Sequence, residues 1–558
     1  MNINKNKNRF MKGLSDKIFI ATCSSFVVCN NAVADLKLSA NSSLTSVYQD
    51  ISSEENGNDS FTTFSVNPTL NASYQSKTIN SLWQGKVTYL KRGRNEDIID
   101  DTYGEYNYKA IWSPLGDVFL VSASGALKYQ NAQSGNFLVS DFFTNAEALT
   151  KSRSNRFAIT GKLERGSWIR GDATLSYSDV ASEPNIIAAF PALNNDTYFA
   201  SGELSSGKDA KYVLWQITGT FQSTDRLDRN QGNFVTRTSS AFVDVHLLGN
   251  WAVRINGNHE GNQISSADNA SSIVRTFDSY GAGLTYRQSE NRFASITTNI
   301  SKSDAVENNN ISFIGLDVQW ALTERTGLSI KYGRRFFGET ASASLKFNSR
   351  ALRTAFTYTE DVTNASRLLS NPENLGVFVC PVNSISISNC FQPNSLNYSP
   401  NADEQLVQFS NQNIDINDNV IIRKSSNLQL SYDFSRVTVG GSFRYSEDDA
   451  LEQDRLIRTY SFESSVYYRV GTKTRFGAEI EAASITQRSE TFSNGESDNF
   501  NLSFNVEHSI TKNLLFKTGI DFVDRKGDNI NAIGSQNGLF GANFESRRIS
   551  ISLNYSFN

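Results

Sequence analysis

No stretch of 18 uninterrupted apolar residues occurs in this 558-residue sequence, so we expect no helical membrane span. Histidine is scarce, with three residues, and cysteine is limited to four. Neither residue type occurs at metal-ligand spacing, so we expect no metal site and no other cofactor. The net charge of −4 is too small to favour nucleic acid as a partner.

Proline is also rare, with 8 residues, whereas Gly (35), Phe (37) and Tyr (21) are plentiful. Apolar and polar residues alternate strictly over many segments, among them 316–320, 436–445, 501–507 and 549–557. Because successive strand side chains point to opposite faces, each segment has one apolar face and one polar face. The sequence therefore predicts an all-β protein.

Alternation alone does not separate a soluble sandwich from a membrane barrel. Three further features favour the barrel: about two dozen segments follow one another without another domain, aromatic residues lie near segment ends, and short connections alternate with long ones. Short connections include Arg165-Gly166 and Leu248–Asn250, and long ones include Gln49–Ser60 and Gln130–Lys151. We expect a single antiparallel up-and-down transmembrane β-barrel of about 24 strands (roughly 20 to 26), with short periplasmic turns and long extracellular loops. The aromatic residues near segment ends are Trp112, Trp168, Trp215, Trp251, Trp320, Tyr74, Tyr129, Tyr332 and Tyr468.

The N-terminus has the features of an export signal. A basic lead-in precedes a short apolar core, Ile18 to Cys29, and Ala32-Val33-Ala34 supplies a small-x-small cleavage site. We predict cleavage after Ala34, which leaves residues 35–558 as the barrel in the outer membrane. A lipoprotein signal at Cys23 or Cys29 is the alternative, but Thr22 and Val28 are unfavourable residues before a lipidated cysteine.

The longest predicted connection spans residues 360–418 and contains four of the eight prolines. Within it, Cys380 and Cys390 are candidates for one disulfide in an oxidising periplasm. A barrel of about 24 strands encloses a wide lumen unless something fills it. We prefer a connection that folds inward and narrows the lumen, and an extracellular lid is the alternative.

One stretch, from Trp320 to Asn364, reads WALTERTGLSIKYGRRFFGETASASLKFNSRALRTAFTYTEDVTN. Its distinctive pieces are 332–338 (YGRRFFG), the turn Asn348-Ser349-Arg350, and 358–363 (YTEDVT). At Thr359 the family that the stretch resembles usually has Ser. The stretch resembles the outer-membrane β-barrel family associated with the PEP-CTERM and exosortase protein-sorting system, which is encoded beside exopolysaccharide loci. The resemblance implies a role near exopolysaccharide assembly or export, and it supplies no mechanism.

Arg334 and Arg335 lie at the end of a predicted strand, on the outer rim. Two guanidinium groups there could bind acidic sugars or lipopolysaccharide phosphates, because the Arg fork matches such anions. The simpler interpretation, which we favour, is an ion pair with Glu360 and Asp361 on the rim.

His246 shares a predicted face with Asp244, a spacing that a hydrolytic dyad could use. A turn at Leu248–Asn250 would place Asp244 opposite Arg254, so a cross-strand ion pair is the simpler interpretation. We therefore expect no enzymatic activity and no catalytic residues.

Charges of both signs recur on the predicted lumen face. They would keep a pore wet, or they would pair with one another and occlude it. Our leading hypothesis is a passive channel or scaffold that works with exopolysaccharide, its export machinery or protein sorting, and that contacts outer-membrane lipid and lipopolysaccharide. The alternative is a structural or adhesion barrel with a closed lumen that acts through its loops. The lumen-facing charges are Lys128, Glu260, Asp317, Lys331, Arg444, Glu507, Lys517 and Asp521.

Overall fold

The protein is described here from a computed structural model. The residues that the structure describes are 35–54, 57–94, 97–144, 146–163, 166–184, 192–226, 231–266, 272–304, 310–349, 351–370, 377–381, 404–408, 413–490, 494–528 and 543–557. The predicted export signal and its cleavage site after Ala34 lie outside these ranges. No helix in the described ranges has the length and apolar character needed to cross a membrane.

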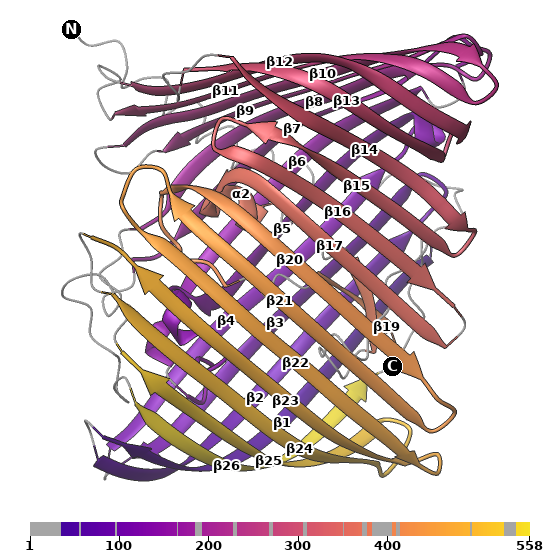
Figure 1. Ribbon diagram of the computed structural model, residues 1–558. Coiled ribbons are helices and arrows are strands. Elements are labelled where there is room, and N and C mark those ends of the chain that lie inside the picture. The colour runs from indigo at the N-terminus through magenta and orange to yellow at the C-terminus, as the bar shows by residue number, and fades with distance from the viewer. Residues whose placement is uncertain are drawn as a thin grey trace, which may run out of the picture.

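One antiparallel sheet of 24 strands forms the wall (Figure 1). Strands in the first half of the chain follow one another with each neighbour paired. They are β1 (Asp35–Ser53), β2 (Gly57–Gln75), β3 (Ile79–Arg94), β4 (Asp97–Trp112), β5 (Phe119–Asn131), β6 (Leu149–Leu163), β7 (Ile169–Ser182), β8 (Asn194–Ser206), β9 (Val213–Arg226), β10 (Gln231–Leu248), β11 (Trp251–Ser266) and β12 (Ser272–Ser289).

The second half continues this meander and closes the ring, because β26 pairs with β1 in the register Leu44↔Leu553. The short elements are 3-10 turns η2 (Gly116–Val118), η3 (Ser134–Asn136) and η4 (Ala146–Ala148), the helix α2 (Ala365–Ser370), and a separate hairpin of β18 (Val377–Pro381) and β19 (Glu404–Gln408). The wall strands are β13 (Arg292–Ser303), β14 (Ile311–Thr323), β15 (Thr326–Arg335), β16 (Gly338–Asn348), β17 (Leu352–Asn364), β20 (Val420–Asp433), β21 (Val437–Ala450), β22 (Leu456–Val470), β23 (Thr474–Arg488), β24 (Gly495–Ser509), β25 (Leu514–Gly527) and β26 (Phe544–Phe557).

The prediction of a closed antiparallel barrel of about 24 strands is confirmed. The wall strands vary in length, from 10 residues in β15 to 19 in β1. The prediction of a long loop at Gln49–Ser60 was wrong. β1 runs to Ser53 and β2 begins at Gly57, because alternation continues through most of that segment.

The outer surface carries an apolar band. On β1, for example, Leu36, Leu38 and Leu44 are more than half exposed. All six tryptophans lie close to the end of the strands that the short turns connect, and Trp168 is 73% exposed. Aromatic rings at this level and apolar side chains between them are what a lipid bilayer requires. A closed ring that pairs its own backbone also satisfies the condition for crossing a membrane. The chain is a transmembrane β-barrel of the outer-membrane type.

The inner face of β1 changes character along its length. Lys37 and Ser39, near the short-turn end, are exposed, whereas Gln49 and Ile51, near the other end, are at most 1% exposed. The same change occurs along β2, from exposed Gln75 to Phe61, which is 3% exposed. The interior beside these strands is therefore open to solvent on the short-turn, periplasmic side and filled on the outer side.

Candidate functional site: the filled outer end of the barrel

The connection between β5 and β6 fills part of the outer end. Sequence alternation placed this segment, Gln130–Lys151, in an extracellular loop, whereas the described residues 132–144 and 146–148 fold into the barrel. Val139 packs in one buried cluster with wall residues Ile51, Phe61, Val523 and Phe544. Phe137 packs in a second cluster against Ile457, Ala483 and Ile485. Leu138, between the two, has a φ of 69°, which turns the backbone so that its neighbours reach opposite sides.

Side chains of the wall hold this segment by hydrogen bonds. Arg548 Nη1 on β26 donates to Asp141 Oδ2 at 2.6 Å, and Gln49 Nε2 on β1 donates to Thr144 Oγ1 at 2.8 Å. Asn499 Nδ2 on β24 donates to the Phe137 carbonyl at 2.7 Å. Arg92 Nη2 on β3 donates to the Phe142 carbonyl at 3.1 Å. The segment is thus tied to four strands without joining their ladder.

Tyr129, which we expected in an aromatic girdle, also contacts this segment. Its ring centroid lies 5.8 Å from that of Phe142 and 4.9 Å from that of Tyr103. Both contacts lie on the outer side of the pair Tyr106↔Leu127, where the β4–β5 ladder ends. The rings therefore cover a break in the wall.

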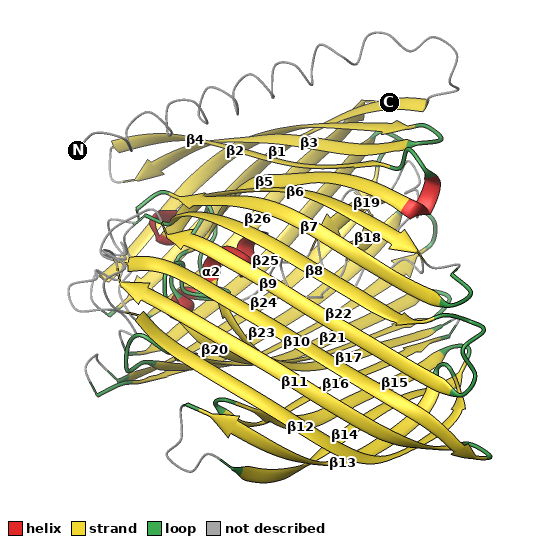
Figure 2. Ribbon diagram, turned by 90° about the horizontal axis from the view of Figure 1, so that it is seen from above, coloured by secondary structure: helices red, strands yellow, loops and turns green. Residues whose placement is uncertain are grey.

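The predicted connection 360–418 contributes a second filling. Its bounds need correction, because residues 360–364 continue β17 and the described connection begins with α2. Ser366 in α2 and Asp418 both accept hydrogen bonds from Asn195 Nδ2 on β8, at 2.6 Å and 2.5 Å. Asp415 bonds to Arg455 at 2.6 Å and accepts the Ser134 backbone N–H at 2.7 Å. Residues 365–370 and 413–419 of this connection therefore lie inside the barrel, where Figure 2 shows α2, and 413–419 contacts the first segment.

The candidate disulfide stays a prediction. Cys390 lies outside the described residues. Cys380 belongs to the short strand β18, whose backbone alone is described.

Arg334 and Arg335 are not brought together. They are consecutive residues of β15, and the β15–β16 ladder pairs Arg334 with Glu339, so alternation turns the two side chains to opposite faces. Arg335 donates two hydrogen bonds to the carboxylate of Glu260 on β11, at 2.9 Å and 2.6 Å. The expected pairing with Asp361 is present at 3.4 Å, but Glu260 is the main partner.

Asp244 and His246 do not form a dyad in the structure. Asp244 is 1% exposed and binds Arg254 through both oxygens, at 2.7 Å and 2.8 Å, as the predicted cross-strand pair. It also accepts bonds from Arg287 at 2.9 Å and Thr285 at 3.2 Å. His246 lies exposed on β10. The carboxylate therefore already has four bonds to other groups.

Several of the other lumen-facing charges form ion pairs. Asp317 bonds to Arg254 at 2.9 Å, and Glu507 bonds to Arg475 at 2.7 Å and to Lys517 at 3.5 Å. In the described ranges, no three His, Cys, Asp or Glu side chains gather in a metal-binding arrangement.

Sequence reasoning missed the interior position of residues 132–148. A signal was present, because this segment contains large apolar residues that an exposed loop would leave in water. They are Phe137, Leu138, Val139, Phe142 and Phe143.

No protein-family model and no curated protein sequence matches this chain. Among solved structures, the FrpB iron transporter from Neisseria meningitidis (F3-3 variant) aligns with 93% of this chain and 81% of its own, at 11% identity and a TM-score of 0.42. The copper transporter OprC aligns with 94% and 81%, at 9% identity and a TM-score of 0.40. A loop-deletion mutant of OmpT from Vibrio cholerae aligns with 94% and 99%, at 9% identity and a TM-score of 0.28. The assignment of the fold rests on this chain's own closed ladder.

Proposed function

We propose that this protein is a gated outer-membrane channel for polar solutes, closed at its outer end by residues 132–148, 365–370 and 413–419. The observation that supports this most is the change along the inner face of β1, from exposed Lys37 to buried Gln49. The interior is thus reachable from the periplasm and blocked on the outer side. A lining of Ser, Thr, Asn and paired charges suits polar solutes.

The way the filling is attached also supports a gate. Arg548, Gln49 and Asn499 hold residues 132–148 by individual side-chain hydrogen bonds. Each such bond contributes about 1 kcal/mol, or about 2 kcal/mol where a charged group takes part. On leaving the wall the segment would also lose the packing of Phe137 and Val139, but it has no backbone ladder to lose, as a strand would.

We assign the cargo from the resemblance of residues 320–364. It favours exopolysaccharide, or a component of PEP-CTERM protein sorting, as the material that passes or is held. Lipopolysaccharide around the rim is the proposed lipid partner. This function requires no catalysis, and the four bonds of Asp244 agree with a structural role for that residue.

The test is single-channel conductance of refolded residues 35–558 in planar bilayers. A variant in which a Gly-Ser linker replaces residues 134–143 should conduct more than the parent. The matched control carries the same linker in the β25–β26 connection and should conduct like the parent. Polysaccharide added to the conducting variant should block it. If all three proteins fold and stay silent, the channel proposal fails.

A barrel that is closed inside and acts through its loops is the second candidate. The locked network around Arg254 favours it, because that arc of the interior is filled by the wall's own side chains. Silence of the linker variant, together with binding of polysaccharide to the intact protein, would support this candidate.

A further inference from the structure

The ladder between β16 and β17 is interrupted at its outer half. It runs from Asn348↔Arg353 to Ala343↔Tyr358 and stops there. β16 nevertheless continues to Gly338 paired with β15, and β17 continues to Asn364 paired with β20. The two strands beside the gap are therefore each paired on their other side. The interruption is not caused by fraying of a strand end.

The outer end of β17 lies inside the molecule. Val362, Thr363 and Asn364 are each at most 1% exposed although they point alternately to the two faces. The start of β20 is similar, with Val420 at 0% and Ile422 at 7% exposed. A strand of the wall would have one face toward lipid, so these ends have left the wall.

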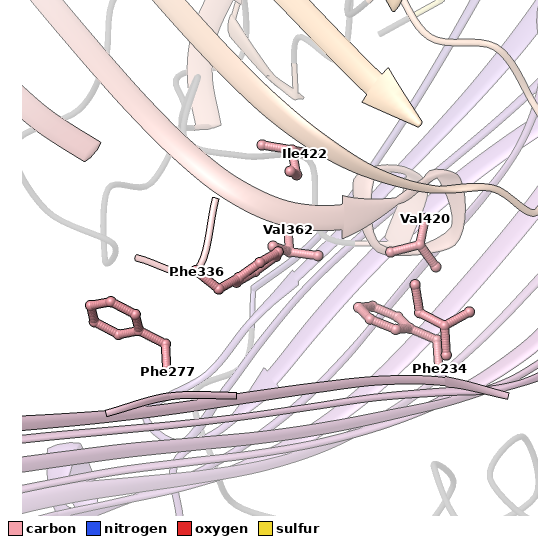
Figure 3. Packing of buried hydrophobic residues seen from close by; sticks show 7 residues of the cluster. Phe234, Phe277, Phe336, Val362, Val420 and Ile422 are labelled. Atoms are coloured by element: carbon pink, nitrogen blue, oxygen red, sulfur yellow. The ribbon is translucent and has the colours of Figure 1, made fainter. Parts of the chain in front are cut away.

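The face that is buried here belongs to the lipid-facing side of the strands. On β20, Val420 and Ile422 alternate in register with Leu430, which is 45% exposed on the outer surface. Their side chains pack with Val362 against Phe234 of β10 and Phe277 of β12 (Figure 3). The outer faces of β17 and β20 thus cover the inner face of β10 and β12.

The residues that hold β17 in this position belong to the YGRRFFG run. Phe336, at the tip of the β15–β16 hairpin, packs beside Val362 in the same cluster. Arg335 Nη1 donates to the Glu360 carbonyl at 3.0 Å, on a stretch of β17 that has no ladder partner in β16. The two distinctive pieces of the sequence, 332–338 and 358–363, therefore meet in one contact. We call this contact of Arg335 and Phe336 with Glu360 and Val362 the latch.

We propose that β17 is the moving element of the gate: its outer end zips onto β16 and withdraws the interior filling. This inference rests on the proposed channel function and concerns its regulation. Continuing the existing β16–β17 register defines the missing residue pairs. Ala341 would then face Glu360, and Glu339 would face Val362. About 16 Å of wall would be completed by the five missing residue pairs.

The sequence suits both positions of the strand. In the zipped wall, Val362, Val420 and Ile422 would lie on the outward face beside Glu339 and Glu360, a mixture of apolar and charged side chains that suits the outer rim. The movement would carry α2 with it, because α2 follows directly after Asn364. The bond between Asn195 and Ser366 would be lost, and the outer end of the lumen would open.

A disulfide between residues 339 and 362 traps the zipped state. We would introduce Glu339→Cys and Val362→Cys into residues 35–558 carrying Cys380→Ser and Cys390→Ser, which leaves no other cysteine, and oxidise the refolded barrel. A disulfide needs Cα atoms within about 7 Å, which adjacent ladder partners satisfy. We expect the disulfide to form, to raise conductance, and to speed amide hydrogen exchange in 365–370 and 413–419. Reduction should reverse all three effects.

Two further pairs calibrate the crosslinking rate. Ala343→Cys with Tyr358→Cys joins existing partners and should crosslink fastest without any change in conductance. Gly104→Cys with Tyr129→Cys continues the register of another interrupted ladder, β4–β5, and should crosslink slowest, because the Glu105 carboxylate rather than a β4 carbonyl accepts the backbone N–H of residue 129. Phe336→Ala loosens the latch and should raise the rate for the 339–362 pair several-fold.

The outcomes separate the two proposals. If the 339–362 pair crosslinks no faster than 104–129 while 343–358 crosslinks readily, β17 does not move and the inference is overturned. Crosslinking without faster exchange in 365–370 and 413–419 also overturns it. A silent linker variant in the conductance test defeats the channel proposal, but crosslinking and exchange still decide whether β17 moves.

Discussion

Two arcs of the barrel wall close their share of the interior in different ways. From β10 to β14 the wall fills the space with its own side chains, since Arg254 of β11 bonds to Asp244 of β10 and to Asp317 of β14. From β22 to β2 the space is filled by a separate segment, residues 132–148. One barrel therefore contains a filling made by the wall's own side chains and a filling made by a separate segment.

Wall curvature accounts for the difference. In a flat sheet β11 and β14, three positions apart, would lie about 14 Å from each other. The 2.9 Å bond from Arg254 to Asp317, and a 2.8 Å bond from Asn256 of β11 to Asn299 of β13, require a tightly curled arc. Between β22 and β2 it is instead Phe137 and Val139 of residues 132–148 that pack against the wall.

The largest effect is expected in the tight arc. Asp244→Ala would leave Arg254, which is 3% exposed, without its bidentate partner. Breaking a buried pair on one side costs about 3–5 kcal/mol, and we expect that loss in the free energy of unfolding, measured by urea titration of the refolded barrel. Asp317→Ala, whose carboxylate is partly exposed, is the control and should lose less. Equal losses would mean that the deeper burial of Asp244 is not what makes its pair with Arg254 important.

A smaller loss of stability, with a larger change in conductance, is expected from a substitution between β22 and β2, where residues 132–148 fill the interior. Arg548→Ala removes the bond to Asp141 and should cost about 1.5–3 kcal/mol, the range for a hydrogen bond to a charged group. The segment should then detach more often, and channel openings in planar bilayers should become more frequent.

Arg547→Ala is the matched control for this change. Arg547 is the preceding residue of β26, and its side chain is 71% exposed. It should leave the openings unchanged. If both variants open equally, residues 132–148 are not held by the Arg548 contact.

The wall was predictable because its information is local. Strict alternation sets which face each residue takes, and the turn at Leu248–Asn250 sets the register that places Asp244 opposite Arg254. The partner of Arg335 was not predictable. Glu260 lies 75 positions earlier, and its approach depends on how far the sheet curls between β11 and β15.

The filling was harder to predict because a connection has no ladder to fix its place. Residues 132–148 and 413–419 could lie outside or inside with the same alternation in the flanking strands. The apolar side chains of Phe137 and Val139 indicate an interior position only once an unfilled lumen is known to exist beside them. A surplus of large apolar residues in a long barrel connection is therefore a useful sign that the connection folds into the lumen.

The smallest effect is expected at His246, which lies on β10 two residue pairs from Asp244↔Arg254 and takes no part in the bonds of that pair. His246→Ala removes an exposed side chain, so the free energy of unfolding should change by less than about 0.5 kcal/mol. Hydrolysis of activated esters by the parent and the variant should be indistinguishable, because the Asp244 carboxylate binds Arg254, Arg287 and Thr285. An activity that the parent shows and His246→Ala loses would contradict the structural role of Asp244. It would require the Arg254 bonds to open during turnover, and the tight arc would then be less fixed than its contacts indicate.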